Sequence, residues 1–182
     1  MNIEKVFIKD LLIIKPDVYY DSRGFFFESY NKSRFENIGL NYNFVQDNIS
    51  KSKKGTIRGL HYQVGESAQD KLCFVLLGKV LDVAVDIRFG SPTFGKYFSI
   101  ELSEENKLQF LIPKGFAHGF SVLSEEAVFC YKCSSFYNKN SERIIRFDDP
   151  NLSIDWKVDK PIVSDKDLNG KLFSEIDKDF TY

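Results

Sequence analysis

The chain has only two histidines, and each is a candidate for chemistry. His61 lies in the segment RGLHYQ at residues 58–63, and His118 lies in PKGFAHGF at residues 113–120. An imidazole has an ordinary pKa near about 6.5, which suits proton abstraction at neutral pH. The residue type alone leaves three interpretations open: structural histidines, metal ligands or a catalytic base.

The residues around the histidines argue against a metal site. Residues 113–118 have the P-x-G-x-x-H pattern of cupin metal proteins, in which an earlier segment supplies His-x-His and a glutamate. Gln63 stands where the second histidine of that segment belongs. A catalytic metal usually needs three protein ligands, and two histidines without a placed carboxylate fall short of that number. We therefore expect no metal ion and favour a metal-free site in which His61 is a base.

Cys130 and Cys133 match the C-x-x-C pattern of redox proteins. Reactive pairs of this kind lie at helix N-termini, whereas this pair lies in a strand-like run, where residues three apart face opposite sides. The one further cysteine, Cys73, cannot complete a four-cysteine zinc site. We expect structural thiols, with Tyr131 and Cys133 on one face of the strand and Cys130 and Lys132 on the other.

The segment DSRGFFFE at residues 21–28 opens with a turn and continues as an aromatic strand. It has two interpretations. It is either a core strand with Arg23 in solvent, or a binding element. In the second case the planar guanidinium of Arg23 binds a phosphate, while a ring such as Phe26 lines a nucleobase pocket.

The elements that must position these residues are short strands. Apolar runs separated by turn residues recur between residues 44 and 137, at 71–77, 80–88, 97–102, 108–112, 117–123 and 127–137. A spacing of about 8–12 residues between turn signals is typical of a β-sandwich or small barrel. Residues 71–77 and 80–88 flank a Gly-Lys turn, which predicts a hairpin. In the second run Leu81, Val83, Val85 and Ile87 alternate with Asp82, Ala84 and Asp86. One face of that strand therefore carries large apolar side chains, and the other carries two carboxylates and an alanine.

Helix signals are few. Residues 33–36 have capping-box spacing and Gly39 can end the short helix that they begin. A terminal helix is predicted over residues 172–180. The prediction is therefore an all-β fold, a barrel with a few short peripheral helices.

Composition limits the partners. The chain has 182 residues, of which 43% are hydrophobic and 28% charged, which is typical of one folded domain over residues 1–182. A net charge of -1 provides no basic field for nucleic acid. Residues 1–10 do not resemble a signal peptide, and no segment is long enough to cross a membrane. We expect a cytoplasmic protein with reduced cysteines and no nucleic-acid or membrane partner.

Taken together, these segments closely resemble the dTDP-4-dehydrorhamnose 3,5-epimerase family. The matching stretches follow one another through nearly the whole chain, at residues 21–28, 46–48, 58–63, 71–72, 82–88, 91–95, 113–120, 131–132, 148–150 and 164–167. The resemblance implies a cupin-like jelly roll, usually a homodimer, that binds a nucleotide-diphosphate sugar. It also implies an isomerase that works without a cofactor.

The resemblance also assigns roles to residues. His61 matches the catalytic base, Asp167 its carboxylate partner, Tyr131 the acid on the opposite face of the sugar, and Lys71 the cation beside the developing enolate. The positions that match substrate contacts are Arg23, Phe26, Glu28, Gln46, Asn48, Arg58, His118, Tyr137, Glu142 and Lys166.

The implied reaction needs these groups. A ketone at carbon 4 of a sugar acidifies the hydrogens on carbons 3 and 5, because the carbanion is delocalised as an enolate. A base removes one hydrogen, and an acid on the other face returns a proton and inverts the centre. No redox cofactor takes part, and the sequence has no G-x-G-x-x-G dinucleotide motif.

The sequence departs from the usual family pattern at Phe74, at residues 138–140, and at Ile144 and Phe147. These positions leave the nucleobase and the sugar length open, so GDP-linked 4-keto sugars, heptoses and inversion of one centre are alternatives. A sugar-nucleotide ketoisomerase and a binding module without activity are two further alternatives.

Arg58 and His61 are three residues apart, so a flat strand would send them to opposite faces. We hypothesise that Gly59 allows a β-bulge that brings both side chains to one face.

Overall fold

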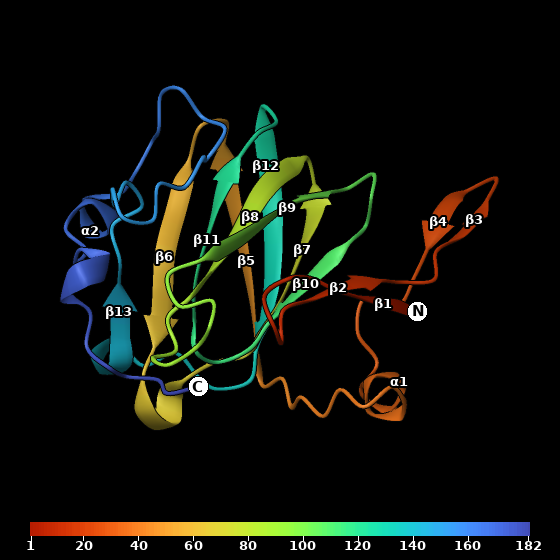
Figure 1. Cartoon of the computed structure of the whole chain (residues 1–182). Helices are drawn as coiled ribbons and strands as arrows, with labels where there is room; N and C mark the ends of the chain where they lie inside the picture. Colours follow the sequence, from red (N-terminus) through yellow and green to blue (C-terminus); the bar gives the residue numbers. More distant parts are fainter.

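Two antiparallel sheets lie face to face in the computed structural model, which describes residues 1–182 (Figure 1). The first sheet has six strands in the order β1-β2-β10-β7-β12-β5, and the second has five in the order β13-β6-β11-β8-β9. A separate two-stranded hairpin, β3-β4, completes the strands. This arrangement confirms the prediction of an all-β, cupin-like jelly roll with short peripheral helices.

The elements have the following bounds. The six-stranded sheet contains β1 (Asn2–Lys5), β2 (Leu12–Lys15), β10 (Gln109–Ile112), β7 (Lys71–Leu77), β12 (Glu126–Cys133) and β5 (Gln46–Lys53). The five-stranded sheet contains β13 (Glu142–Ile144), β6 (Ile57–Gln63), β11 (Phe116–Val122), β8 (Lys79–Asp86) and β9 (Tyr97–Ser103). The hairpin and the helices are β3 (Tyr19–Asp21), β4 (Gly24–Phe26), α1 (Lys32–Asn37) and α2 (Asp165–Leu168).

The inner faces of both sheets share one apolar core. Phe110 and Phe129 come from the six-stranded sheet, and Phe116 and Phe120 from the five-stranded sheet. The alternation predicted for β8 is confirmed: Ala84 joins this inner core. Leu81, Val83 and Val85 point to a second core, together with Ile87 just beyond the strand, on the outer face of the sheet.

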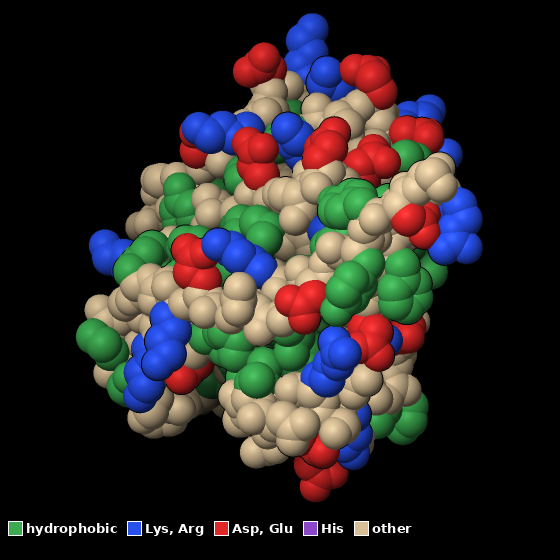
Figure 2. All heavy atoms as spheres, turned by 90° about the vertical axis from the view of Figure 1, so that its right-hand side faces the viewer, with side chains coloured by type: hydrophobic (Ala, Val, Ile, Leu, Met, Phe, Trp, Pro, Cys, Tyr) green, Lys and Arg blue, Asp and Glu red, His purple; other side chains and the backbone are tan.

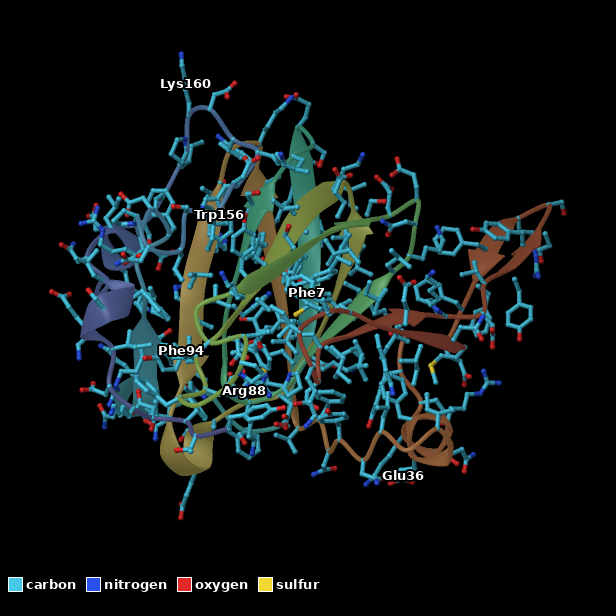
Figure 3. The ribbon with its side chains drawn as sticks, in the orientation of Figure 1. Phe7, Glu36, Arg88, Phe94, Trp156 and Lys160 are labelled. Atoms are coloured by element: carbon cyan, nitrogen blue, oxygen red, sulfur yellow. The ribbon has the colours of Figure 1, made fainter.

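The C-terminal part of the chain covers that outer face. Trp156 packs there, on the β6 and β11 side of the barrel (Figure 3).

The hairpin predicted from residues 71–77 and 80–88 is wrong. Both strands form, but β7 lies in the six-stranded sheet and β8 in the five-stranded sheet. Gly78, with φ of +75°, forms the corner at which the chain crosses between sheets. A turn signal fixes where the chain reverses, whereas the partner of each strand is decided by the burial of both faces.

The short helix near residue 33 is confirmed, with a different cap. Helix α1 begins at Lys32, and Asn31 rather than Ser33 caps it, because the Asn31 side chain accepts from Arg34 N at 3.2 Å. Gly39, with φ of +82°, follows its last turn. Phe35 anchors the helix against Ile14 of the six-stranded sheet.

The terminal helix predicted for residues 172–180 is wrong. Only a 3₁₀ turn at Phe173–Glu175 forms. Beyond it the backbone is held to a loop: Phe89 N donates to Phe180 O, and Tyr182 N donates to Phe89 O. Phe173, Ile176 and Phe180 pack against the outer core, so tertiary packing overrides local helix propensity. No helix of the structure combines the length and the apolar character that a membrane crossing requires.

The bulge hypothesised at Gly59 is confirmed by the pairing of β6 with β11. His61 is opposite His118 and Arg58 is opposite Phe120, so two residues of β6 span one residue of β11. His118 and Phe120 are two apart and share a face of their strand. The extra residue in β6 therefore brings Arg58 and His61 to that same inner face.

The β3-β4 hairpin projects away from the barrel (Figure 1). All six of its strand residues are exposed, including Tyr19, Tyr20, Phe25 and Phe26. The face of the molecule seen in Figure 2 shows apolar side chains scattered among charged ones. A two-stranded hairpin is marginally stable alone in water, so this element needs a further surface to pack on.

Gly59→Ala is expected to destabilise the fold strongly. The φ of Gly59 is +133°, and a Cβ there would lie 2.5 Å from Gly119 Cα, which is backbone and cannot rotate away. Overpacking and an unfavourable φ each cost energy, so the free energy of unfolding should fall by about 4 kcal/mol. Urea unfolding measures this loss.

Gly65→Ala is the matched control. Gly65 also has a positive φ, +61°, but open space around it, so only about 1 kcal/mol should be lost. Equal losses in the two variants would show that the close approach of β6 to β11 does not constrain residue 59.

Candidate active site

A pocket of about 440 Å³ opens between the two sheets. Its walls come from six strands of the barrel, from helix α2 and from two loops. The residues that line it are Gln46, Asn48, Ile49, Ser50, Arg58, His61, Tyr62, Gln63, Gln69, Lys71, His118, Phe120, Tyr131, Tyr137, Glu142 and Lys166. Ten of the fourteen predicted site residues are in this lining, although they are spread over more than 100 positions of the chain.

His61, in the pocket lining, forms a close pair with Asp167, which lies behind it. His61 Nε2 is 2.6 Å from Asp167 Oδ1, and Gly59 N donates to Asp167 Oδ2 at 3.3 Å. Asp167 belongs to helix α2, which packs beside β6. The Ser164 hydroxyl caps that helix by accepting from Asp167 N. The carboxylate thus fixes the ring of the histidine and the backbone of the bulge together.

Asp167 is ionised at neutral pH. Burial alone would raise the pKa of Asp167, but the hydrogen bond and the charge of His61, with donors from Gly59 and Ser164, hold that pKa below its ordinary value. An ionised Asp167 accepts from His61 Nε2–H, and Nδ1 of His61 then carries the lone pair. This is the state that a histidine base requires.

Tyr131 lies across the pocket on β12. Burial raises the pKa of its phenol to about 12, so the hydroxyl keeps its proton at neutral pH. The predicted faces of β12 are confirmed: Tyr131 packs toward the inner core, whereas Cys130 and Lys132 line a separate hollow on the outer side of the sheet. All three cysteines are free thiols.

Three cations and one carboxylate give the pocket a positive balance. Lys71 is buried, with Nζ 3.5 Å from the carbonyl oxygen of His61, while Arg58 donates from Nε to Ser52 Oγ. Lys166 pairs with Glu142 at 2.7 Å. The pocket therefore favours an anionic ligand.

Hydrogen bonds connect four residues on one side of the pocket and fix their positions. Tyr137 donates from its hydroxyl to Glu142 Oε2 at 3.1 Å and from its backbone N to Gln46 Oε1 at 2.9 Å. Gln46 in turn donates to Asn48 Oδ1 at 3.0 Å. These four predicted residues thus form one connected rim.

His118 also lines the pocket, but its hydrogen bond runs in another direction from that of His61. Its Nε2 is 2.6 Å from Asp82 Oδ1, so the two histidines place their Nε2 atoms on different carboxylates. Gln63, which stands at the cupin ligand position, accepts from Asn138 N at 2.7 Å and positions the 136–138 loop. The donor set of a cupin metal centre is therefore not assembled between the histidines.

Three predicted substrate contacts lie outside the pocket of the same chain. Arg23 pairs with Asp21, Phe26 is 67% exposed on the hairpin, and Glu28 pairs with Arg34 at 3.0 Å. Arg23 is in solvent at a turn, but the interpretation of residues 21–28 as a core strand is wrong, because the strand residues of the hairpin are exposed. Nothing within one chain brings these residues to His61.

Sequence reasoning assigned no role in the site to two buried residues behind the pocket, Asp82 and Cys73. The signal for Asp82 was present, since the alternation in β8 places it opposite the outward-facing leucine and valines. The sequence did not indicate that His118 is the partner of Asp82, because only the pairing of β8 with β11 brings the two residues together.

Comparisons with known proteins agree with this geometry. The model of the dTDP-4-dehydrorhamnose 3,5-epimerase family matches residues 5–175. A dTDP-4-dehydrorhamnose 3,5-epimerase of Shigella flexneri is 54% identical over 178 residues, covering 97% of this chain and 98% of the relative.

Solved structures agree as well. The dTDP-6-deoxy-D-glucose-3,5-epimerase of Legionella pneumophila, in complex with dTDP-4-keto-L-rhamnose, superposes with a TM-score of 0.95 at 51% identity, covering 100% of this chain and 98% of that one. The dTDP-4-dehydrorhamnose 3,5-epimerase of Elizabethkingia anophelis superposes with a TM-score of 0.91 at 56% identity, covering 96% and 97%.

Asp167→Asn is expected to lower the free energy of unfolding by about 2 kcal/mol at pH 7, because a charge-assisted hydrogen bond to a buried carboxylate is lost. A carboxyl with a depressed folded pKa contributes stability above its unfolded pKa and loses it as pH falls through the folded pKa. The difference from wild type should therefore narrow below pH 3.8, the ordinary value.

Urea unfolding across this pH range measures the effect. Asp165→Asn, an exposed change on the same helix, is the control and should be nearly neutral. A deficit of Asp167→Asn that persisted unchanged at low pH would contradict the ionised pair.

Proposed function

Because the chain belongs to the dTDP-4-dehydrorhamnose 3,5-epimerase family, we propose that its pocket binds a dTDP-linked 4-keto-6-deoxyhexose and inverts carbons 3 and 5 of the sugar. The protein is then an isomerase, and its reaction needs no redox step. The observation that carries this proposal is the His61–Asp167 pair at 2.6 Å in a pocket that Tyr131 also lines.

His61 is the proposed base. With Asp167 accepting from Nε2–H, the Nδ1 lone pair takes the hydrogen from carbon 3 or carbon 5, and Asp167 stabilises the imidazolium that forms. The short hydrogen bond fixes the ring, so no binding energy is used to orient it when substrate arrives.

Tyr131 is the proposed acid. Its raised pKa keeps the proton on the phenol until an enolate is present. Since Tyr131 comes from the six-stranded sheet and His61 from the five-stranded sheet, a flat sugar ring between the sheets meets the base and the acid on opposite faces. Proton removal from one face and return to the other inverts the centre.

The cations of the pocket have two proposed tasks. Lys71 is buried beside the His61 strand, where a fixed ammonium stabilises the negative oxygen of the enolate. Arg58 and Lys166 lie nearer the solvent, where they bind the diphosphate, and the Gln46, Asn48, Tyr137 and Glu142 rim closes around the substrate.

We further propose a homodimer in which the hairpin of one subunit completes the pocket of the other. Arg23, Phe26 and Glu28 match substrate contacts, yet in one chain they lie outside the pocket. The exposed aromatic residues of β3 and β4 supply apolar surface for such packing, and Phe26 then stacks on the nucleobase while Arg23 binds a phosphate.

The proposed setting is the cytoplasm, where the free Cys73, Cys130 and Cys133 stay reduced. Residues 1–182 act as one domain in this proposal, because both sheets and the C-terminal segment contribute to a single pocket.

Incubation of the protein with the dTDP-linked 4-keto-6-deoxyhexose in deuterium oxide tests the function. The wild type should incorporate two deuterons, at carbons 3 and 5, and yield the doubly inverted product by NMR. His61→Ala should lose about 10²–10⁴-fold in rate, the usual range for a general base. Tyr131→Phe should still exchange hydrogen while failing to invert one centre.

The other outcomes are equally informative. A single deuteron in the wild type indicates inversion of one centre. Turnover of the GDP-linked sugar but not of the dTDP-linked one would show that the pocket recognises guanine instead of thymine. A moved carbonyl in the product would identify a ketoisomerase. Normal double inversion by Tyr131→Phe would refute the acid assignment.

Mixed dimers test the shared pocket. The Arg23→Ala dimer should lose about 10–100-fold in kcat/KM, because a charge-assisted phosphate contact is removed. A mixed dimer of one Arg23→Ala subunit and one His61→Ala subunit has one pocket with both changes and one pocket with neither. Isolated with two different affinity tags, it should recover about half of the wild-type activity. No recovery would mean that each pocket is complete within one chain.

A further inference from the structure

A second cluster of metal-ligating side chains lies behind the pocket. Cys73 on β7, Asp82 on β8 and His118 on β11 are all buried, and their ligating atoms lie within 4.8 Å of one another. His118 Nε2 is 2.6 Å from Asp82 Oδ1 and 3.7 Å from Cys73 Sγ. The mechanism proposed above uses neither Cys73 nor Asp82.

The arrangement differs from a catalytic triad. In a triad the carboxylate and the nucleophile lie at the two different nitrogens of the imidazole, so that the ring mediates between them. Here the carboxylate and the thiol both face Nε2 of His118. Three donors of different chemistry therefore converge on one point, as the ligands of a cation do.

Asp82 supplies an independent observation. Its side chain is completely buried, and its Oδ2 atom has no hydrogen-bond donor from the protein. A buried carboxylate oxygen without a partner is costly, and such atoms are few in native proteins. A cation bound by Cys73, His118 and the Asp82 carboxylate would neutralise the buried negative charge that this oxygen shares.

We propose that Cys73, Asp82 and His118 bind a soft divalent cation such as Zn²⁺, which reaches them through the pocket past His118. Zinc takes thiolate, imidazole and carboxylate ligands, and one thiolate with one carboxylate balances its two charges. A fourth position is left for water or for an anion from the pocket.

The distances suit a tetrahedral ion after a small adjustment. With zinc bond lengths of about 2.3 Å to sulfur and about 2.0 Å to nitrogen, the sulfur and nitrogen ligands lie about 3.6 Å apart. The observed 3.7 Å between Cys73 Sγ and His118 Nε2 fits this value. Asp82 Oδ1 would move back by about 0.8 Å to reach the separation expected for oxygen and nitrogen ligands.

The cation inhibits the enzyme in this proposal. His118 lines the substrate pocket, and Lys71, the proposed enolate cation, acts on the same histidine through its charge. A bound ion replaces the hydrogen bond between His118 Nε2 and Asp82 and adds positive charge behind the pocket. Binding of the ion and productive binding of the sugar therefore compete.

Titration of the untagged, full-length protein with Co²⁺ tests the site. We expect about one equivalent to bind with a thiolate-to-cobalt charge-transfer band in the near ultraviolet, and Zn²⁺ to displace it. Cys73→Val replaces the thiol by apolar groups with one added heavy atom and should abolish the band, weakening Zn²⁺ binding at least about tenfold. Cys130→Val, on the outer side of the sheet, is the matched control and should bind Co²⁺ as the wild type does.

Inhibition is the second measurement. Zn²⁺ should inhibit the wild type and Cys130→Val, and the half-inhibiting concentration should rise at least about tenfold in Cys73→Val. A charge-transfer band retained in Cys73→Val, no band in the wild type, or equal inhibition of all three proteins would overturn the proposal. The cobalt spectrum requires no substrate, so it stands or fails separately from the proposed epimerase activity.

Discussion

The one extra residue in β6, opposite β11, is the constraint on which the rest of the site depends. Without it Arg58 and His61 would point to opposite sides of the five-stranded sheet. With it both face the interior, and the backbone N–H of Gly59 donates to the same carboxylate that holds His61. On the other side of the bulge Leu60 exchanges two backbone hydrogen bonds with Ile145. The irregularity is therefore held by Asp167 on one side and by the C-terminal segment on the other, and one carboxylate holds both the bulge backbone and the His61 ring.

Burial favours a raised pKa at both Tyr131 and Asp167, but only the pKa of Tyr131 is raised. Burial raises the pKa of Tyr131 to about 12, and the opposing charge of Arg58 is too weak to offset it, so the phenol stays protonated. It would also raise the pKa of Asp167, but hydrogen bonds from His61, Gly59 and Ser164 outweigh it, so this carboxylate stays ionised. One barrel interior thus keeps an acid and the partner of a base in the states that proton transfer requires. The hydrogen bonds that each group accepts, not the depth at which it is buried, decide whether its pKa rises or falls.

Substrate binding and chemistry are divided between different parts of the fold. The proposed base, acid and enolate cation lie on the strands of the barrel, which pack around Phe110, Phe120 and Phe129. The residues that match nucleotide contacts lie on a hairpin that projects from it (Figure 1). A hairpin can be exchanged or reshaped without disturbing the barrel core, which gives a physical reason for nucleotide preference to vary while the enolate chemistry is kept.

The sequence alone determined the strands from β7 to β12, the two faces of β8 and β12, the bulge and the family, because alternation, turn residues and ordered motifs are local properties of the chain. It also identified most of the pocket lining, since motif matches carry positions with them. The tertiary structure decided what local patterns cannot encode. It placed β7 and β8 in different sheets, replaced the expected terminal helix by a segment packed on the outer core, and left Arg23 and Phe26 far from His61. It alone joined Cys73, Asp82 and His118, because residues from three strands meet only when both sheets close on one interior.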